Sequence, residues 1–121
     1  MPKKILIVDD STVMRMTVSS VLKESGYEVV EAENGQVALE KAVQTTIDLI
    51  ICDVNMPVMD GLTFARQIKM EPDYRFVPII MLTTVTGQSE MEAGKAAGVK
   101  AWMVKPFDKV KLLGAVSKLL G

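Results

Sequence analysis

Acidic residues follow two of the most apolar runs in the sequence, at the point where each run ends. Asp9 and Asp10 come directly after residues 5–8, and Asp53 comes directly after residues 49–52. Because the carboxyl ends of parallel strands meet at one edge of a sheet, we expect these three carboxylates to lie together. Carboxylates packed closely repel one another, and a divalent cation relieves that repulsion. Mg²⁺ suits such a site, because it prefers oxygen ligands and keeps several waters.

A hydroxyl and an ammonium group follow two further apolar runs. Thr83 comes after residues 79–82, and Lys105 comes after residues 101–104. By the same topology both side chains should reach the edge that holds the carboxylates. Lysine adds a positive charge that can meet a phosphoryl oxygen, and threonine adds a hydrogen-bond donor. One carboxylate then remains free to attack phosphorus, and aspartyl phosphate is a known use of a carboxylate nucleophile.

The apolar runs alternate with stretches of helical periodicity, which predicts a (βα)5 fold. Short apolar runs bounded by turn residues are typical of strands buried on both faces. Right-handed crossovers place helices on both faces of such a sheet. The predicted class is therefore α/β, a doubly wound parallel sheet of five strands that makes residues 1–121 a single domain. The strands are expected at residues 5–8, 27–30, 49–52, 78–82 and 101–104.

Capping and stop residues mark the helices between these runs. Ser89 and Glu92 have the spacing of a capping box at the start of the fourth helix. Glycine commonly ends a helix, and aspartate or asparagine commonly begins one. The expected boundaries are Gly26 for the end of the first helix, Asn34 for the start of the second, residues 62–70 for the third, Gly98 for the end of the fourth and Asp108 for the start of the fifth.

Composition excludes several classes of function. A net charge of -1 provides no field to attract nucleic acid or anionic lipid, and no apolar run approaches a membrane span. The absence of histidine excludes Ser-His-Asp and Cys-His catalytic pairs and any histidine metal site. Cys52 lies in an apolar run and is interpreted as a core residue in a reducing compartment. With no signal-peptide pattern, we expect a cytoplasmic monomer that binds neither nucleic acid nor membrane.

Four motifs in order resemble the receiver domain of two-component response regulators. The resemblance covers essentially the whole chain, and the lack of an output domain is similar to the single-domain, CheY-like chemotaxis regulators. It implies a flavodoxin-like sheet with strand order 2-1-3-4-5. The motifs are Val8-Asp9-Asp10, then Asp53-x-Asn55-Met56-Pro57-x-Met59-Asp60-Gly61, then Leu82-Thr83, and finally Lys105-Pro106-Phe107.

The resemblance implies a role for each acidic residue. Asp53 accepts a phosphoryl group from the phosphohistidine of a sensor histidine kinase. Asp10 and Asp53 bind Mg²⁺ directly, together with the backbone carbonyl of Asn55, and Asp9 acts through a metal-bound water. No other cofactor is implied. The chain is expected to be a signalling switch rather than an enzyme, although it catalyses its own phosphorylation and dephosphorylation.

The resemblance also implies how the switch is read. Lys105 pairs with Asp53 and later with the phosphoryl group, the bond before Pro106 is cis, and Thr83 moves its hydroxyl onto a phosphoryl oxygen. Trp102 changes its packing in response. The fourth helix, fifth strand and fifth helix then present an altered surface to an output protein, such as a flagellar motor switch component in chemotaxis. A phosphatase is a further expected partner.

Three positions depart from the usual pattern of this family. Trp102 stands where tyrosine or phenylalanine is more common, so a simple flip of the ring is not expected. Thr84 stands where a very small residue is common, and Val85 stands where chemotaxis relatives often carry glutamate. We therefore expect Asn55, Thr84 and Val85 to tune the loss of phosphate from Asp53, with Thr84 and Val85 slowing it.

Other functions remain open on the same fold. The chain could be a phosphorelay intermediate, or it could regulate a target other than a motor. An aspartate-nucleophile phosphatase needs a second acid two residues after the nucleophile, where this sequence has Asn55. A flavodoxin-like electron carrier is disfavoured because three acids would repel a flavin phosphate. A phosphate-independent scaffold is the remaining alternative.

Overall fold

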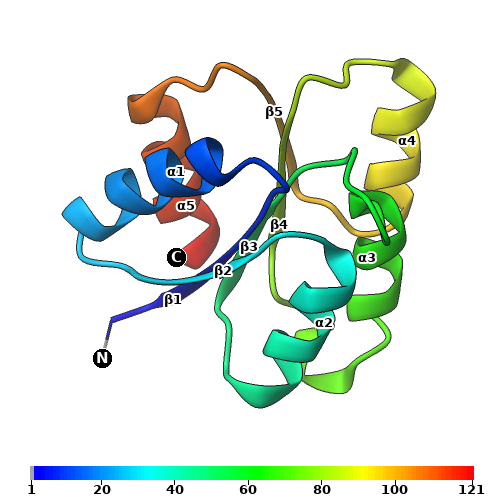
Figure 1. Ribbon diagram of the computed structural model, residues 1–121, viewed down its shortest axis with the longest axis horizontal. Coiled ribbons are helices and arrows are strands. Elements are labelled where there is room, and N and C mark those ends of the chain that lie inside the picture. The colour runs from blue at the N-terminus through cyan, green and yellow to red at the C-terminus, as the bar shows by residue number, and fades with distance from the viewer. Residues whose placement is uncertain (1) are drawn as a thin grey trace.

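Residues 2–121, the part of the chain that the computed structural model describes, contain one parallel sheet in the order β2-β1-β3-β4-β5 (Figure 1). This confirms the predicted fold class and strand order. The register pairs Val8 with both Ala32 and Cys52, and Thr83 with Val104, so the carboxyl ends of neighbouring strands share one edge. The strands are β1 (Lys4–Val8), β2 (Glu28–Ala32), β3 (Leu49–Cys52), β4 (Ile79–Thr83) and β5 (Ala101–Val104).

Helices cover both faces of the sheet, with α1 and α5 on one side and α2, α3 and α4 on the other (Figure 1). Alternate strand residues supply the two cores, as in β1, where Ile5 and Ile7 face one way and Leu6 and Val8 the other. Within residues 2–121, no helix has both the length and the apolar character that a membrane crossing requires. The helices are α1 (Thr12–Glu24), α2 (Gly35–Gln44), α3 (Gly61–Ile68), the 3-10 helix η1 (Pro72–Tyr74), α4 (Gln88–Ala96) and α5 (Lys109–Leu120).

The two edge strands differ from the prediction of strands buried on both faces. Most residues of β2 and β5 are only partly buried, because each strand has a single neighbour in the sheet. The strand predicted at residues 27–30 lies at 28–32, and the helix predicted at 62–70 is α3. The turn η1, which follows α3, was not predicted.

Predicted helix caps are partly correct. Asn34 and Asp108 each accept a hydrogen bond from a backbone N–H three residues later, as expected. The capping box predicted at Ser89 and Glu92 is wrong, because α4 begins at Gln88 after Gly87, which has no side chain with which to cap. Ser89 therefore lies inside the first turn, where its hydroxyl contacts the carboxylate of Glu90.

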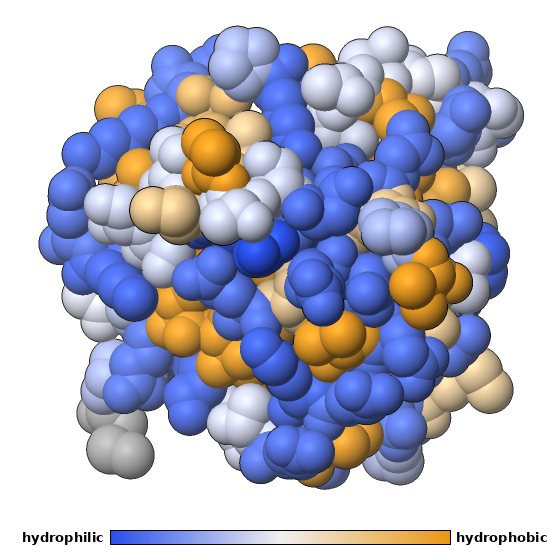
Figure 2. Space-filling model, viewed as in Figure 1, coloured by the Kyte–Doolittle hydropathy of each residue, from blue (hydrophilic) through white to orange (hydrophobic). Residues whose placement is uncertain are grey.

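The surface seen in the same orientation is mainly hydrophilic. In Figure 2 the apolar side chains on this face form small separate groups between polar ones. Hydrophobic residues make up 49% of the chain. Most of the large apolar side chains in the three central strands are fully buried, so these strands form a rigid platform for the residues at their carboxyl ends.

Candidate functional site

Three carboxylates meet at the carboxyl edge of the sheet. Asp9 and Asp10 follow β1 and Asp53 follows β3, and each side chain offers one oxygen within 4.8 Å of those of the other two. Asp9 and Asp53 are only 3% and 8% exposed, whereas Asp10 is exposed. The structure thus brings together the acidic residues that the sequence singled out. A set of three carboxylate oxygens fits a hard divalent cation such as Mg²⁺.

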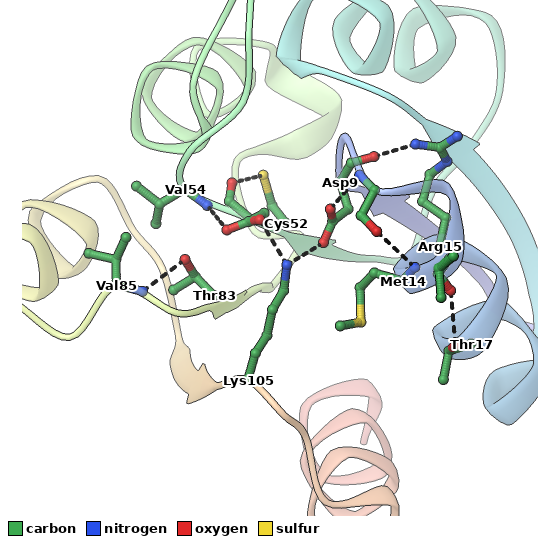
Figure 3. Close-up of polar contacts among 12 residues, drawn as sticks. Asp9, Met14, Arg15, Thr17, Cys52, Val54, Thr83, Val85 and Lys105 are labelled. Carbon is green, nitrogen blue, oxygen red and sulfur yellow. Dashed lines mark hydrogen bonds and ion pairs between the residues drawn. The ribbon is translucent and has the colours of Figure 1, made fainter.

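The ammonium group of Lys105 lies between two of these carboxylates (Figure 3). Its Nζ donates to Oδ2 of Asp9 at 2.8 Å and to Oδ2 of Asp53 at 2.9 Å. Burial lowers the pKa of Lys105, but the hydrogen bonds and negative charges of Asp9 and Asp53 outweigh it and raise that pKa above its ordinary value. Lys105 is therefore charged at neutral pH. The bond between Lys105 and Pro106 is cis.

The three carboxylates differ in whether their other oxygens have hydrogen-bond partners. Oδ1 of Asp53 accepts the backbone N–H of Val54 at 2.7 Å, and Oδ1 of Asp9 accepts that of Ser11 at 2.9 Å. Among residues 2–121, Asp10 has no side-chain hydrogen bond or ion pair. Asp10 is therefore the carboxylate of the cluster that can bind a cation without giving up a hydrogen-bond partner.

Cys52 is the last residue of β3 and directly precedes Asp53. It is fully buried, and its thiol donates to the backbone carbonyl of Asp53 at 3.1 Å. Burial, followed by the charges of Asp53, Asp9 and Asp60, raises the pKa of Cys52 well above its ordinary value. The thiol therefore stays neutral, in agreement with its interpretation as a core residue.

Thr83 is the last residue of β4 rather than the first residue after it, and it is fully buried. Its hydroxyl accepts the backbone N–H of Val85 at 3.2 Å. The backbone N–H of Lys105 donates to the carbonyl oxygen of Thr83 at 2.9 Å, but among the described residues no hydrogen bond joins the Thr83 hydroxyl to Asp53 or Lys105. The threonine hydroxyl therefore belongs to the turn after β4 in this structure.

The residues expected to tune phosphate loss lie in the loops that border the cluster. Asn55, two residues after Asp53, and Thr84 are exposed. Val85 is partly buried and, like Trp102, packs against one of the two hydrophobic cores. Val85 is therefore less exposed than either of its neighbours in the turn, Thr84 and Thr86.

Trp102 connects three elements of the fold. Its indole Nε1 donates to the carbonyl oxygen of Val85 at 2.8 Å, which ties β5 to the loop before α4. The ring also lies against Gly94 of α4, so closely that a Cβ at that position would stand 2.7 Å from Cζ3 of Trp102. Sequence reasoning missed Gly94, although a glycine in the middle of a helical pattern is a recognised sign of close packing.

A groove of about 410 Å³ lies beside Trp102, between α4 and β5. Its walls are mainly apolar and carry charged groups at intervals. Met91 and Trp102 supply apolar surface, and Glu92 and Lys95 supply charges of opposite sign. The groove places Trp102 on a surface that a partner protein could contact.

Comparison with known proteins gives consistent matches over the whole fold. Residues 5–117 match the response regulator receiver domain family. Chemotaxis protein CheY of Bacillus subtilis is 42% identical, over 99% of this chain and 99% of its own length. The crystal structure of CheY4, a chemotaxis protein of Vibrio cholerae, has a TM-score of 0.94 at 44% identity, over 98% of this chain and 99% of that chain.

A further solved structure bears on the acidic cluster. It is the receiver domain of the sensor histidine kinase PA1611 from Pseudomonas aeruginosa, with a magnesium ion coordinated in its active-site cleft. Its TM-score is 0.92 at 30% identity, over 100% of this chain and 99% of that chain. The stretch matched by the family, 5–117, contains every candidate site residue described above.

Proposed function

The chain belongs to the family of response regulator receiver domains, and from this premise we propose that it is a phosphorylation-driven binding switch. Asp53 is the phosphoacceptor, and the donor is a phosphohistidine of a sensor histidine kinase. The observation that carries this proposal is the position of Asp53, held by Lys105 and the N–H of Val54 beside two further carboxylates. Phosphoryl transfer depends mainly on such positioning and on neutralisation of charge.

Mg²⁺ is the cofactor that the site would take. Asp10, Asp53 and the backbone carbonyl of Asn55 would hold it directly, and Asp9 would hold it through a water. When bound, the cation offsets the negative charge of the acidic cluster and of the incoming phosphoryl group. The magnesium ion in the PA1611 receiver domain supports this assignment.

In the transfer step, an oxygen of Asp53 forms a bond to phosphorus as the bond from phosphorus to the imidazole nitrogen breaks. The donor's imidazole leaves as a neutral ring, because the nitrogen that does not bear the phosphoryl group already carries a proton. Lys105 already touches Oδ2 of Asp53, so its ammonium group needs only a small movement to donate to a phosphoryl oxygen. The step therefore uses Lys105 as a charge partner, without a proton transfer from it.

The switch step starts at Thr83. When its hydroxyl turns to donate to a phosphoryl oxygen, the N–H of Val85 changes its partner, because that N–H donates to the same hydroxyl before phosphorylation. The carbonyl oxygen of Val85 accepts a hydrogen bond from the indole of Trp102, so movement of the turn changes the position of the indole. The groove between α4 and β5 changes with it.

The output partner docks on α4, β5 and α5. Similarity to chemotaxis proteins over almost the whole chain supports a role in chemotaxis, with a flagellar motor switch component as the target and a phosphatase as a second partner. Residues 1–121 act as one response regulatory domain in the cytoplasm. The alternatives are a phosphorelay intermediate and a regulator of a non-motor target. Transfer of phosphate from Asp53 to a candidate histidine protein would separate a relay from a switch.

Affinity capture tests the switch itself. The protein is immobilised with Mg²⁺ and beryllium fluoride, which mimics the phosphoryl group, and is compared with the Asp53→Asn variant under the same conditions. A protein retained only by the first sample is the expected output partner. Identical sets of bound proteins on the two samples would contradict a phosphorylation-driven switch.

A further inference from the structure

Arg15 contacts the backbone of the acidic turn, although no motif drew attention to it. Its side chain extends from the first turns of α1, and Nη1 donates to the backbone carbonyl oxygen of Asp9 at 2.6 Å (Figure 3). Its Nε lies 3.4 Å from a carboxylate oxygen of Glu31 on β2. The side chain is only 15% exposed, so the guanidinium group is held between the turn and the neighbouring strand.

The carbonyl that Arg15 holds belongs to the peptide group between Asp9 and Asp10. A peptide group is planar, so fixing the direction of its carbonyl also fixes the position of the next Cα. On the other side, the N–H of Ser11 donates to Oδ1 of Asp9 at 2.9 Å. Asp10 therefore lies in a turn whose backbone is held from both directions.

Asp10 depends on this backbone more than the other two carboxylates do. Lys105 and a backbone N–H hold both Asp9 and Asp53 by their side chains. Asp10 is exposed and, within residues 2–121, makes no such contact. The direction in which its carboxylate points is thus set by the backbone on which it stands.

We propose that Arg15 is a positioning residue for the divalent cation, acting through the Asp9–Asp10 peptide group to aim the carboxylate of Asp10 into the cluster. The inference rests on the proposed function, because it concerns the same cation site. Groups that orient metal ligands from outside the coordination shell commonly change metal affinity by about 10- to 100-fold. Arg15 would orient the ligand Asp10 in the same way, through the planar peptide group between Asp9 and Asp10.

The sign of the effect separates positioning from simple electrostatics. Arg15 carries a positive charge close to the site, so its removal should strengthen cation binding if the charge alone matters. If Arg15 aims Asp10, its removal should weaken cation binding. The two roles therefore predict opposite changes in the dissociation constant for Mg²⁺.

The test is isothermal titration calorimetry of Mg²⁺ with the wild type and with Arg15→Met. Methionine keeps an unbranched apolar stem while removing the donors. We expect the dissociation constant for Mg²⁺ to rise about tenfold. An unchanged or lower dissociation constant would overturn the inference. Arg66→Met is the matched control, because Arg66 reaches a threonine three residues earlier, as Arg15 does, and makes no hydrogen bond or ion pair with the cluster in the described residues.

A double-mutant cycle shows whether Arg15 acts through Asp10. In the Asp10→Asn background, Arg15→Met should leave the already weakened Mg²⁺ affinity nearly unchanged, because the carboxylate to be aimed is gone. Full additivity of the two effects would refute the route through Asp10. If Arg15→Met does not fold, as unfolding in EDTA would show, Arg15→Lys is the second variant. It keeps the positive charge but lacks the guanidinium group that joins the carbonyl of Asp9 to Glu31, and it should raise the dissociation constant by a smaller factor. No rise in that variant would likewise refute the inference.

The same titrations distinguish this inference from the proposed function. If the wild type binds Mg²⁺ and Arg15→Met binds it equally well, only the positioning role is wrong. If the wild type itself does not bind Mg²⁺, the proposed function and the role of Arg15 are both overturned.

Discussion

The indole nitrogen of Trp102, on β5, donates to the carbonyl oxygen of Val85, in the loop after β4, over 2.8 Å. The N–H of the same valine donates to the hydroxyl of Thr83 over 3.2 Å. The two proposed switch residues are thus connected through the backbone of a single residue. Because no side-chain atom of Val85 takes part, that side chain can be replaced without removing either bond.

The contact between Gly94 and Trp102 gives a first prediction. In Gly94→Ala the new Cβ would stand 2.7 Å from the indole ring, which must shift and strain its bond to Val85. Overpacking of this kind outweighs the better helix propensity of alanine, so the free energy of unfolding should fall by about 1 kcal/mol. Urea unfolding and the emission maximum of Trp102 measure the two effects.

Gly114→Ala on α5 is the control for this change. A Cβ at Gly114 meets no atom within 4 Å, so only the propensity gain remains and stability should rise by about 1 kcal/mol. If both alanine variants were stabilised alike, the packing of Gly94 against Trp102 would not hold in solution.

Lys105→Met tests the charge balance of the cluster. Without the ammonium group, Asp9 and Asp53 lose the cation that they share, so stability in EDTA should fall and the affinity for Mg²⁺ should rise. Isothermal titration calorimetry with Mg²⁺ measures the affinity of the variant and of the wild type. Weaker Mg²⁺ binding by the variant would contradict competition between Lys105 and the cation.

The raised pKa of Lys105 also predicts a pH dependence with a definite sign. A lysine whose pKa is higher in the folded state stabilises the fold fully below its unfolded pKa of 10.5, and this contribution is lost as pH rises through the folded value. The stability difference in EDTA between the wild type and Lys105→Met should therefore be constant from about pH 7 to 10 and shrink above that. A difference that already shrinks between pH 7 and 9 would be inconsistent with this pairing.

Much of the fold and the acidic cluster followed from the sequence, because both are consequences of strand ends. The apolar runs before Asp9, Asp53 and Lys105 predicted parallel strands, and parallel strands carry these side chains to one edge. The same reasoning placed Thr83 after its strand, whereas pairing with Val104 extends β4 through that residue. Where a strand ends depends on its pairing with the neighbouring strand, and the residues around Thr83 do not reveal that pairing.

Contacts to the backbone could not be predicted in the same way. Arg15 bonds the carbonyl of Asp9, and Trp102 bonds that of Val85. Every residue has a backbone carbonyl, so the residue type does not indicate which carbonyl will accept such a bond. The missed capping residue, Gly87, has a similar cause, because Ser89 and Glu92 fit the capping pattern and only the three-dimensional path of the loop excludes them.

Val58 is a strained position in the loop that follows Asp53. Its φ of 69° lies in the left-handed region, it is 82% exposed, and Met59 closes the turn by donating to the carbonyl of Pro57 at 2.7 Å. Valine is unfavourable in this conformation, so Val58→Gly should raise the free energy of unfolding by about 1 kcal/mol. The control Val43→Gly, at an exposed position in α2, should lower it. A loss of stability in Val58→Gly would show that the turn is not strained.

Thr84 and Val85 are predicted to slow the loss of phosphate from Asp53. Glutamate at Val85 would supply an acceptor that can orient an attacking water, and alanine at Thr84 would clear space next to the turn. The decay rate of phosphorylated Asp53 should therefore increase in Val85→Glu and in Thr84→Ala, as followed by the return of Trp102 fluorescence. Unchanged decay in both variants would refute this role.

The most direct test of the account is the mass of the intact protein after incubation with Mg²⁺ and a small-molecule phosphodonor. The wild type should gain the mass of one phosphoryl group, located on Asp53, and this gain should disappear in EDTA and in Asp53→Asn. An unchanged mass of the wild type, or the same gain in Asp53→Asn, would contradict it.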